Sequence, residues 1–261
     1  MSTEDRDPST HDGDEESRSS ASPKPRNPLP LWQETGLLLV VALVLAVVVK
    51  TFFVQAFYIP SESMEPGLVN QDRILVQKVS YWGGGEPQRG DVVVFKDPGG
   101  WLEGAAAEES DNPFVKVMTK VGLYPSGGHL VKRVIGVEGD VIECCDEEGR
   151  LLINGQPMDE DAYVKDDPGT PCNGPMTGTC DWKAGPVPEG HVFVMGDNRG
   201  RSADSTRKMC TPDETDCVPG REFVPADLVV GKVFVVLWPW DHFRWVTRPD
   251  VFDDVAAAGR E

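Results

Sequence analysis

One continuous apolar run stands out from the mixed hydrophobic and polar pattern of the chain. It starts at Gly36 and reads GLLLVVALVLAVVVKTFFVQAF, with Lys50 as its one charged residue. Trp32 before it and Tyr58 after it give the run aromatic ends. A helix of about 20 apolar residues crosses a bilayer, and aromatic side chains favour the bilayer surfaces. The pattern predicts a single membrane anchor over residues 31–57.

Two other interpretations of this run are a cleavable signal peptide and a buried core helix. The apolar part of a signal peptide is about 7 to 15 residues long and follows a short basic start. The run here is longer and follows a long acidic segment. An uncleaved anchor therefore fits better.

The basic residues beside the run bear on its orientation. Lys24 and Arg26 precede it, whereas Lys50 and Arg73 lie at or beyond its end, and basic residues favour the cytoplasmic side. Because the long side chain of Lys50 can reach the interface from a helix end, we expect a cytoplasmic amino terminus. The chain from about Tyr58 onward then lies outside the cytoplasm, at the cell (plasma) membrane.

Beyond the anchor, short Val-rich segments alternate with turns. The segments read DRILVQKVSY, GDVVVFKD, HLVKRVIGV, DVIEC, RLLINGQ, HVFVMGD and GKVFVVLW, bounded by Gly, Asp or Pro. Such segments are typical of β-strands, and no amphipathic helices alternate with them as a doubly wound sheet requires. We predict a mainly β, antiparallel domain over residues 58–248.

Other parts of the chain lack this strand pattern. Connections near 97–128 and 158–189 are rich in Gly, Pro and acids, which predicts surface insertions. Residues 1–30 are rich in Ser, Pro and acids and cannot bury enough apolar surface to fold, so we expect a disordered cytoplasmic tail. Residues 249–261 contain no second apolar span and are expected to form a carboxyl-terminal tail.

The formal net charge of the chain is −18, from 43 acidic and 25 basic residues. Nucleic-acid binding needs concentrated Lys and Arg to meet the phosphates. The balance therefore argues against nucleic acid as a partner. Acidity of this kind favours solubility and does not itself indicate a function.

Four of the six cysteines fall into two closely spaced pairs. Cys172 with Cys180, and Cys210 with Cys217, each bracket a short loop that contains Gly, Pro or Thr. Such loops suit disulfide bonds in an oxidising compartment. We predict these two bonds, which agree with an extracytoplasmic domain.

The remaining cysteines, Cys144 and Cys145, are adjacent, and their pairing stays open. A zinc site is the alternative use of the thiols. No CxxC pair occurs, and the four histidines do not fall at ligand spacing near the cysteines. We therefore expect no metal.

The stretch YIPSESMEPGL directly follows the apolar run and carries two hydroxyls, Ser61 and Ser63. A serine is a poor nucleophile until a base takes its proton, and His is the usual base. His191 and His242 flank predicted strands and fit structural roles better. The other available base is a lysine whose pKa burial lowers to about 7 or 8.

Lys132 is the one good candidate for that base. In HLVKRVIGVEGD it interrupts an apolar strand, and the period of two places it on one face with Leu130 and Val134. That face would desolvate its amine. The alternative is that Lys132 and Arg133 are ordinary strand charges, since lysines are seldom fully buried.

Four segments follow the anchor in order: PSESMEPGL, RGDVVVF, KRVIGVEGD and GDNRGRSADS. Together they resemble the motifs of the bacterial type I signal peptidases, and the match extends over about residues 36–240. The resemblance implies a serine endopeptidase that uses a Ser/Lys dyad to release signal peptides from translocated secretory preproteins at the lipid bilayer. It implies no cofactor, and we expect a monomer.

The resemblance assigns roles to matching residues. It makes Ser63 the nucleophile and Lys132 the general base, which later protonates the leaving amine. Ser61 would be the side-chain donor of the oxyanion hole, beside the backbone N–H of Ser63. Ser202 matches the serine that hydrogen-bonds the lysine amine.

Two further groups match the family. The residues expected to hold the active-site loop in shape are Asp197, Asn198 and Asp204. The residues expected to line shallow apolar substrate pockets are Ile59, Pro60, Met64 and Val131. Small pockets suit the small residues of A-x-A cleavage sites.

The chain also departs from the family pattern. Thr206 follows SADS where many members have Arg directly, and Arg207 comes one step later. Gly67 stands where Thr is common, and Glu62 and Glu65 flank the nucleophile. Acidic side chains close to a lysine raise its pKa, so we expect both glutamates to face solvent.

The segment LWPWDHFRW places Trp238, Trp240, Phe243 and Trp245 close together. One interpretation is a membrane-surface contact, because Trp favours the headgroup region. The other is a core or sheet-edge cluster, because large aromatic residues dominate cores.

Three other functions are compatible with parts of the sequence. A catalytically inactive, membrane-anchored binding module would be indifferent to the loss of Ser63 or Lys132. A penicillin-binding enzyme needs its lysine three residues after the serine, where Pro66 stands. A self-cleaving regulatory protease shares the dyad chemistry, but the anchor and the lack of a DNA-binding motif oppose it.

Overall fold

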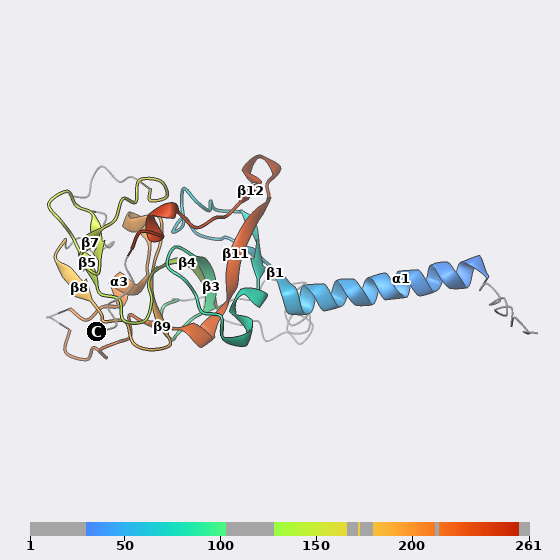
Figure 1. Ribbon diagram of the computed structural model, residues 1–261, viewed down its shortest axis with the longest axis horizontal. Coiled ribbons are helices and arrows are strands. Elements are labelled where there is room, and N and C mark those ends of the chain that lie inside the picture. Colours follow the sequence, from blue (N-terminus) through green and yellow to red (C-terminus); the bar gives the residue numbers. More distant parts are fainter. Residues whose placement is uncertain (1–29, 103–127, 166–171, 173–179, 212–213, 256–261) are drawn as a thin grey trace, which may run out of the picture. The chain divides into compact units, whose positions relative to one another are not determined.

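The computed structural model describes residues 30–102, 128–165, 172, 180–211 and 214–255 (Figure 1). The tail expected over residues 1–30 lies outside this part except for Pro30, and so does most of the connection near 97–128. The chain divides between Ala42 and Leu43 into two compact units.

Helix α1 (Leu31–Val48) takes up most of the apolar run, and none of its residues is buried. It is the one helix among the described residues that is long and apolar enough to cross a membrane. A π-helical turn, η1 (Val49–Phe53), follows it, and then strand β1 (Val54–Tyr58) begins. The last apolar residues are therefore a strand, not part of the anchor helix, because they pair in register with the next strand and bury Phe57.

The larger sheet has eight strands, and all of its pairings are antiparallel. They are β1, β2 (Arg73–Gln77), β3 (Val92–Lys96), β4 (His129–Gly136), β9 (His191–Met195), β10 (Val224–Pro225), β11 (Val229–Trp238) and β12 (Arg244–Trp245). Their order is β1-β2-β11-β3-β4-β9-β10, and β12 pairs with β11. Strand β4, which carries Lys132, therefore has a neighbour on each side.

A smaller antiparallel sheet has four strands in the order β7-β6-β5-β8. They are β5 (Ile142–Cys144), β6 (Leu151–Ile153), β7 (Gln156–Pro157) and β8 (Trp182–Ala184). Figure 1 shows this sheet and the β11–β12 hairpin at opposite ends of the strand-rich unit. The predicted mainly β, antiparallel class is confirmed.

Short helices connect the strands. They are η2 (Val79–Gly84), η4 (Arg199–Arg201), α3 (Ser205–Lys208), η5 (Ala226–Leu228), η6 (Trp240–His242) and η7 (Asp250–Phe252). The α3 helix is only four residues long and ends the loop that bears Ser202.

Three apolar clusters hold the sheets together. One joins the small sheet to β9 through residues such as Ile153 and Phe193, both fully buried. A second lies beneath the nucleophile stretch and contains Ile59, Met64 and Leu68. Burial of a large apolar side chain contributes roughly 1.5 to 3 kcal/mol, so the second cluster anchors the backbone on both sides of Ser63.

The connection near 158–189 is not merely a surface insertion. Its described residues include Met158, Tyr163 and Val164, which are buried in the cluster beside the small sheet. The few apolar side chains of this segment face the core. The segment is acidic on average, so its composition did not predict their burial. At the other end of the chain, Phe252 and Val255 pack into the same cluster.

Candidate active site

The nucleophile candidate, Ser63, lies in a bent loop after β1 and is 6% exposed. Buried Met64 follows it, and the Leu68 N–H donates to the Met64 carbonyl. On the other side, the Asn198 N–H donates to the Ser63 carbonyl at 3.1 Å, and Asn198 Nδ2 donates to the Glu62 carbonyl. The loop is thereby fixed both to the core and to the segment after β9.

Lys132 reaches this loop from the centre of the larger sheet. It is 4% exposed, and its Nζ donates to Ser63 Oγ at 2.6 Å. The strand pairing places Lys132 opposite Val93 of β3. Two residues far apart in sequence are thus in direct contact, within the distance that proton transfer requires.

Burial lowers the pKa of the Lys132 amine from 10.5 to about 8, and the charges of Asp204 and Asp197 partly oppose this. Desolvation destabilises the charged ammonium and so favours the neutral amine. A neutral amine can accept a proton, whereas an ammonium cannot. The environment therefore suits Lys132 to act as a base near neutral or mildly alkaline pH.

Ser61 and Ser202 differ in their contacts with Ser63 and Lys132. Ser61 is exposed, and its Oγ lies 3.2 Å from Ser63 Oγ. Ser202 is fully buried, and its hydroxyl has no hydrogen-bond partner among the described residues. The hydrogen bond to the lysine amine that the resemblance implies is thus not formed in this structure.

Gly196 explains how Ser202 comes close to the nucleophile loop. A Cβ at this position would lie only 2.3 Å from Ser202 Oγ and 2.4 Å from the Ser63 carbonyl oxygen. The backbone at Gly196 therefore separates the two serines with no room for a side chain. The glycine of the GDNRGRSADS segment is required for this approach.

Asp197 is buried and pairs with the guanidinium of Arg133 through two hydrogen bonds of 2.8 and 2.6 Å. Arg133 also donates to the Gly90 carbonyl, and its guanidinium lies 4.5 Å from the centre of the Tyr163 ring. The neighbouring carboxylate raises the pKa of Arg133, although burial opposes this. Arg133 is therefore no ordinary exposed strand charge.

Asp204 is buried and caps α3. Its carboxylate accepts hydrogen bonds from the Gly196 N–H and from the N–H and hydroxyl of Thr206. Where many family members have an arginine, this chain therefore satisfies the carboxylate with a hydroxyl. Arg207, one step later, is exposed.

Sequence reasoning missed a second buried ion pair. Arg199 donates to the carboxylate of Glu160 at 3.0 and 2.6 Å, and its Nε donates to the Gly196 carbonyl. The Tyr163 hydroxyl donates to Glu160 at 2.5 Å. Burial and the nearby carboxylate raise the pKa of Tyr163 well above its usual value. The one signal in the sequence was Arg199 itself, inside the quoted loop segment.

The two glutamates beside the nucleophile have different surroundings. Glu62 is exposed and pairs with Arg201, as expected. Glu65 is half-buried and pairs with Lys165 at 2.6 Å, which the expectation of a solvent-facing side chain did not foresee. Neither glutamate is a cause of the shifted Lys132 pKa.

The expected pocket residues share one apolar cluster, except for Pro60. Ile59 and Met64 are 2% and 1% exposed, and Val131 packs against their cluster. Pro60 is exposed. These residues lie close to Ser63 and Lys132 in the sequence, and their contact with a substrate stays a prediction.

A cavity of about 820 Å³ lies elsewhere, between the segment around Tyr163 and the chain after β12. Arg244 and Arg248 line it, whereas Ser63 and Lys132 do not. The contact between Ser63 and Lys132, and not this cavity, therefore marks the candidate active site.

The described cysteines are all in disulfide bonds. Cys172 is joined to Cys180, and Cys210 to Cys217. The adjacent Cys144 and Cys145 are joined to each other.

The aromatic residues of the β11–β12 hairpin are not in the core. Trp238, Trp240, Phe243 and Trp245 are 45 to 69% exposed. Their rings contact one another in sequence order, with centroids 5.9 to 6.4 Å apart. The core half of the second interpretation is wrong, whereas its sheet-edge half holds for Trp245, because β12 pairs only with β11 among the described strands. The hairpin presents a continuous aromatic surface.

Comparisons with known proteins agree with the motifs. The family model described as signal peptidase, peptidase S26, matches residues 32–238. The chain is similar to signal peptidase I of Mycobacterium tuberculosis, with 39% identity over 250 residues, covering 90% of this chain and 81% of that protein. It is also similar to signal peptidase I of Leptolyngbya laminosa, with 33% identity and coverage of 85% of each chain.

A solved structure is similar as well. It is the crystal structure of a signal peptidase I from Enterococcus faecalis, with 25% sequence identity and a TM-score of 0.32. The match covers 56% of this chain and 96% of that one.

The buried ion pair of Asp197 predicts a large stability effect. Asp197→Ala leaves the Arg133 charge buried without its carboxylate, so the free energy of unfolding should fall by about 3 to 5 kcal/mol. The matched control is Glu62→Ala, which removes an exposed ion pair from the same region and should cost less than about 1 kcal/mol. Urea denaturation of the two variants checks this, and equal losses would contradict it.

Proposed function

Because the chain belongs to the signal peptidase family, peptidase S26, we propose that it is a membrane-bound serine endopeptidase with a Ser63/Lys132 dyad. Its substrates are secretory preproteins, and it cuts after A-x-A sites to remove their signal peptides. The observation that carries the proposal is the 2.6 Å contact between the buried Lys132 Nζ and Ser63 Oγ.

The reaction follows from that contact. Neutral Lys132 takes the proton of Ser63 as its Oγ attacks the scissile carbonyl, and the resulting ammonium then protonates the leaving amine. An ester of Ser63 with the signal peptide is left. Lys132, neutral again, activates a water that hydrolyses the ester. Each half of the cycle returns the amine to its starting state, so the mechanism needs no metal or other cofactor.

Ser61 stabilises the charge that develops on the carbonyl oxygen. Its hydroxyl is exposed beside Ser63 Oγ, at 3.2 Å, and can turn toward a bound substrate. The backbone N–H of Ser63 supplies the second donor. Loss of one such donor costs about 10²- to 10³-fold in rate.

The loop after β9 supports the dyad. Asn198 fixes the backbone of Ser63, and Asp197 and Asp204 fix the shape of the loop. We assign the orienting of the amine to Ser202, whose buried hydroxyl has no partner among the described residues. A buried hydroxyl without a partner costs about 1 to 3 kcal/mol. That penalty favours a hydrogen bond between Ser202 and the Lys132 amine at a stage of the cycle when the amine is not bonded to Ser63 Oγ.

The apolar residues around the dyad bind the substrate. Pro60 is exposed and Val131 is partly buried, so these two offer apolar surface, whereas Ile59 and Met64, 2% and 1% exposed, support that surface from the core. Shallow contacts of this kind fit the small side chains of an A-x-A site. The α1 anchor, with a cytoplasmic amino terminus, holds the domain outside the cytoplasm, where translocated preproteins present such sites.

The dyad is tested by cleavage of a preprotein that carries an A-x-A site. Ser63→Ala, Lys132→Ala and Lys132→Arg should each lose at least about 10³-fold in turnover, because each removes one member of a nucleophile-base pair. Ser61→Ala should cut more slowly but still bind the substrate. Lys183→Ala is the matched control, since this lysine is exposed in β8, and it should cut at the wild-type rate.

Full cutting by Lys132→Ala would exclude the dyad. No cutting by the wild-type protein, together with intact preprotein binding, would favour the inactive binding module instead.

The aromatic hairpin supports a second part of the proposal, contact with the lipid bilayer. Exposed aromatic patches on a monomer mark interaction surfaces, and Trp favours the headgroup region. Trp240 and Trp245 are 69% and 65% exposed. We assign these two residues to the bilayer surface.

Quenching of tryptophan fluorescence by brominated lipids tests this contact in proteoliposomes. Trp240→Phe with Trp245→Phe should remove a large share of the quenched emission, because these rings lie at headgroup depth. The matched control, Trp101→Phe, removes a tryptophan that is 5% exposed and should leave the quenched emission unchanged. If the double variant loses only unquenched emission, the hairpin faces water.

A further inference from the structure

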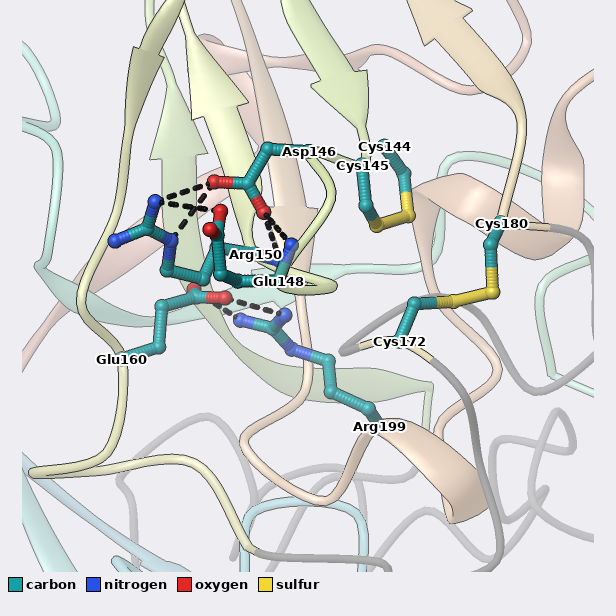
Figure 2. Close-up of a disulfide and its surroundings, with 9 residues drawn as sticks. All are labelled: Cys144, Cys145, Asp146, Glu148, Arg150, Glu160, Cys172, Cys180 and Arg199. Atoms are coloured by element: carbon teal, nitrogen blue, oxygen red, sulfur yellow. Dashed lines mark hydrogen bonds and ion pairs between the residues drawn. A yellow bond between two sulfur atoms is a disulfide. The ribbon is translucent and has the colours of Figure 1, made fainter.

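Two of the three disulfides lie side by side. The sulfur atoms of Cys144, Cys145 and Cys172 are all within 4.8 Å of one another, and Cys172 is bonded to Cys180. Figure 2 shows the Cys144–Cys145 and Cys172–Cys180 bonds near each other, and Cys144 is the last residue of β5. We call these four cysteines the sulfur cluster.

Local structure holds the sulfur cluster together. Cys144 ends β5 and pairs with Trp182 of β8, and Cys180 lies two residues before that tryptophan. Cys144 and Cys172 belong to the apolar cluster of the small sheet, and Cys145 and Cys180 pack against it. The proximity is therefore set by the fold.

The four sulfurs differ in exposure. Cys144 and Cys172 are 5% and 8% exposed, whereas Cys145 and Cys180 are half-buried. Each disulfide thus has one sheltered and one accessible residue, and the sheltered sulfurs are close to each other. Thiol–disulfide exchange needs a thiolate within reach of a disulfide sulfur. Opening the Cys144–Cys145 bond would leave the Cys144 thiolate within 4.8 Å of Cys172 Sγ.

We propose that the sulfur cluster is a thiol–disulfide exchange site, and that its reaction partner is the dithiol of an extracytoplasmic oxidoreductase. One partner thiolate attacks Cys145 Sγ, and the Cys144 thiolate leaves. That thiolate attacks Cys172 Sγ and displaces the Cys180 thiolate. The second partner thiol then attacks the mixed disulfide at the partner's own sulfur and releases Cys145.

The electrons and protons of this sequence balance. The partner dithiol is oxidised to a disulfide and gives up two electrons and two protons. The chain gains them as it passes from two disulfides to one Cys144–Cys172 disulfide and two thiols, Cys145 and Cys180. The inner exchange, from Cys144 to Cys172, changes no oxidation state.

The sulfur cluster is linked to the dyad through one segment. Tyr163 and Val164 share its apolar cluster. Val164 also pairs with Pro66, and the Lys165 N–H donates to the Asp197 carbonyl. Opening the Cys172–Cys180 bond should loosen this segment and slow peptide cleavage; this consequence rests on the proposed function.

The exchange is tested on the full chain in detergent with one equivalent of dithiothreitol as the dithiol. After acid quenching, free thiols are alkylated and disulfides are mapped by mass spectrometry. We expect a Cys144–Cys172 cross-link, with Cys145 and Cys180 alkylated and Cys210–Cys217 intact. Loss of the original two bonds without any Cys144–Cys172 cross-link would overturn the proposal.

A pair of variants gives the same test without a reductant. Cys145→Ser leaves a free Cys144 thiol beside the Cys172–Cys180 disulfide. Exchange would release the Cys180 thiol, so the alkylating reagent should label Cys180 as well as Cys144. The matched control, Cys210→Ser, leaves Cys217 free away from the cluster, and only Cys217 should be labelled. Labelling of Cys144 alone in Cys145→Ser would also refute exchange.

Cleavage of an A-x-A preprotein provides a separate readout in the same samples. Formation of the cross-link should lower the cleavage rate. If the cross-link forms and the cleavage rate is unchanged, the proposed effect of the sulfur cluster on the dyad is refuted, whereas the exchange site is supported. An inactive wild-type protein that still forms the cross-link would refute the proposed peptidase function alone.

Discussion

The contact between one buried amine and one hydroxyl sets what the rest of this domain must do. The proposed base Lys132 must be shielded from water so that its pKa falls to about 8. The negative charges of Asp204 and Asp197 raise that pKa and so oppose the effect of burial. The fold limits their effect by giving each carboxylate other partners. Arg133 neutralises Asp197, and hydrogen-bond donors from Gly196 and Thr206 surround Asp204. The carboxylates can then shape the loop without holding the proton on the amine.

Support for the dyad comes from segments that are distant in sequence. The Glu160–Arg199 pair and Tyr163 fix the loop from one side, and the apolar cluster around Met64 fixes the nucleophile from the other. Buried ion pairs contribute little net stability compared with apolar packing, but breaking one is costly. Such pairs favour one geometry over others, which the proposed catalytic contact of 2.6 Å between Lys132 Nζ and Ser63 Oγ requires.

The sequence was sufficient for features that depend on local pattern. Val-rich segments predicted the antiparallel class, and alternation in β4 placed Lys132 on a face with Leu130 and Val134. Alternation alone left an ordinary strand charge open, and the motif resemblance favoured the buried base. The sequence was insufficient for features that depend on residues far apart in the chain. Nothing near Glu160 indicates a buried arginine partner, and the apolar run gives no sign that Val54–Tyr58 would leave the helix to pair with β2. Exposure of Trp240 likewise depends on what the hairpin packs against, since aromatic residues suit both cores and membrane surfaces.

The protonation state of Lys132 is the central claim, and NMR titration measures it directly. The chain is labelled with ¹³C at the lysine ε-carbons, and Lys132→Arg assigns the signal. The account predicts that this signal titrates near pH 8, because burial lowers the pKa of the Lys132 amine from 10.5 to about 8. A Lys132 signal that titrates at about pH 10.4, the value of an unperturbed lysine, would contradict it.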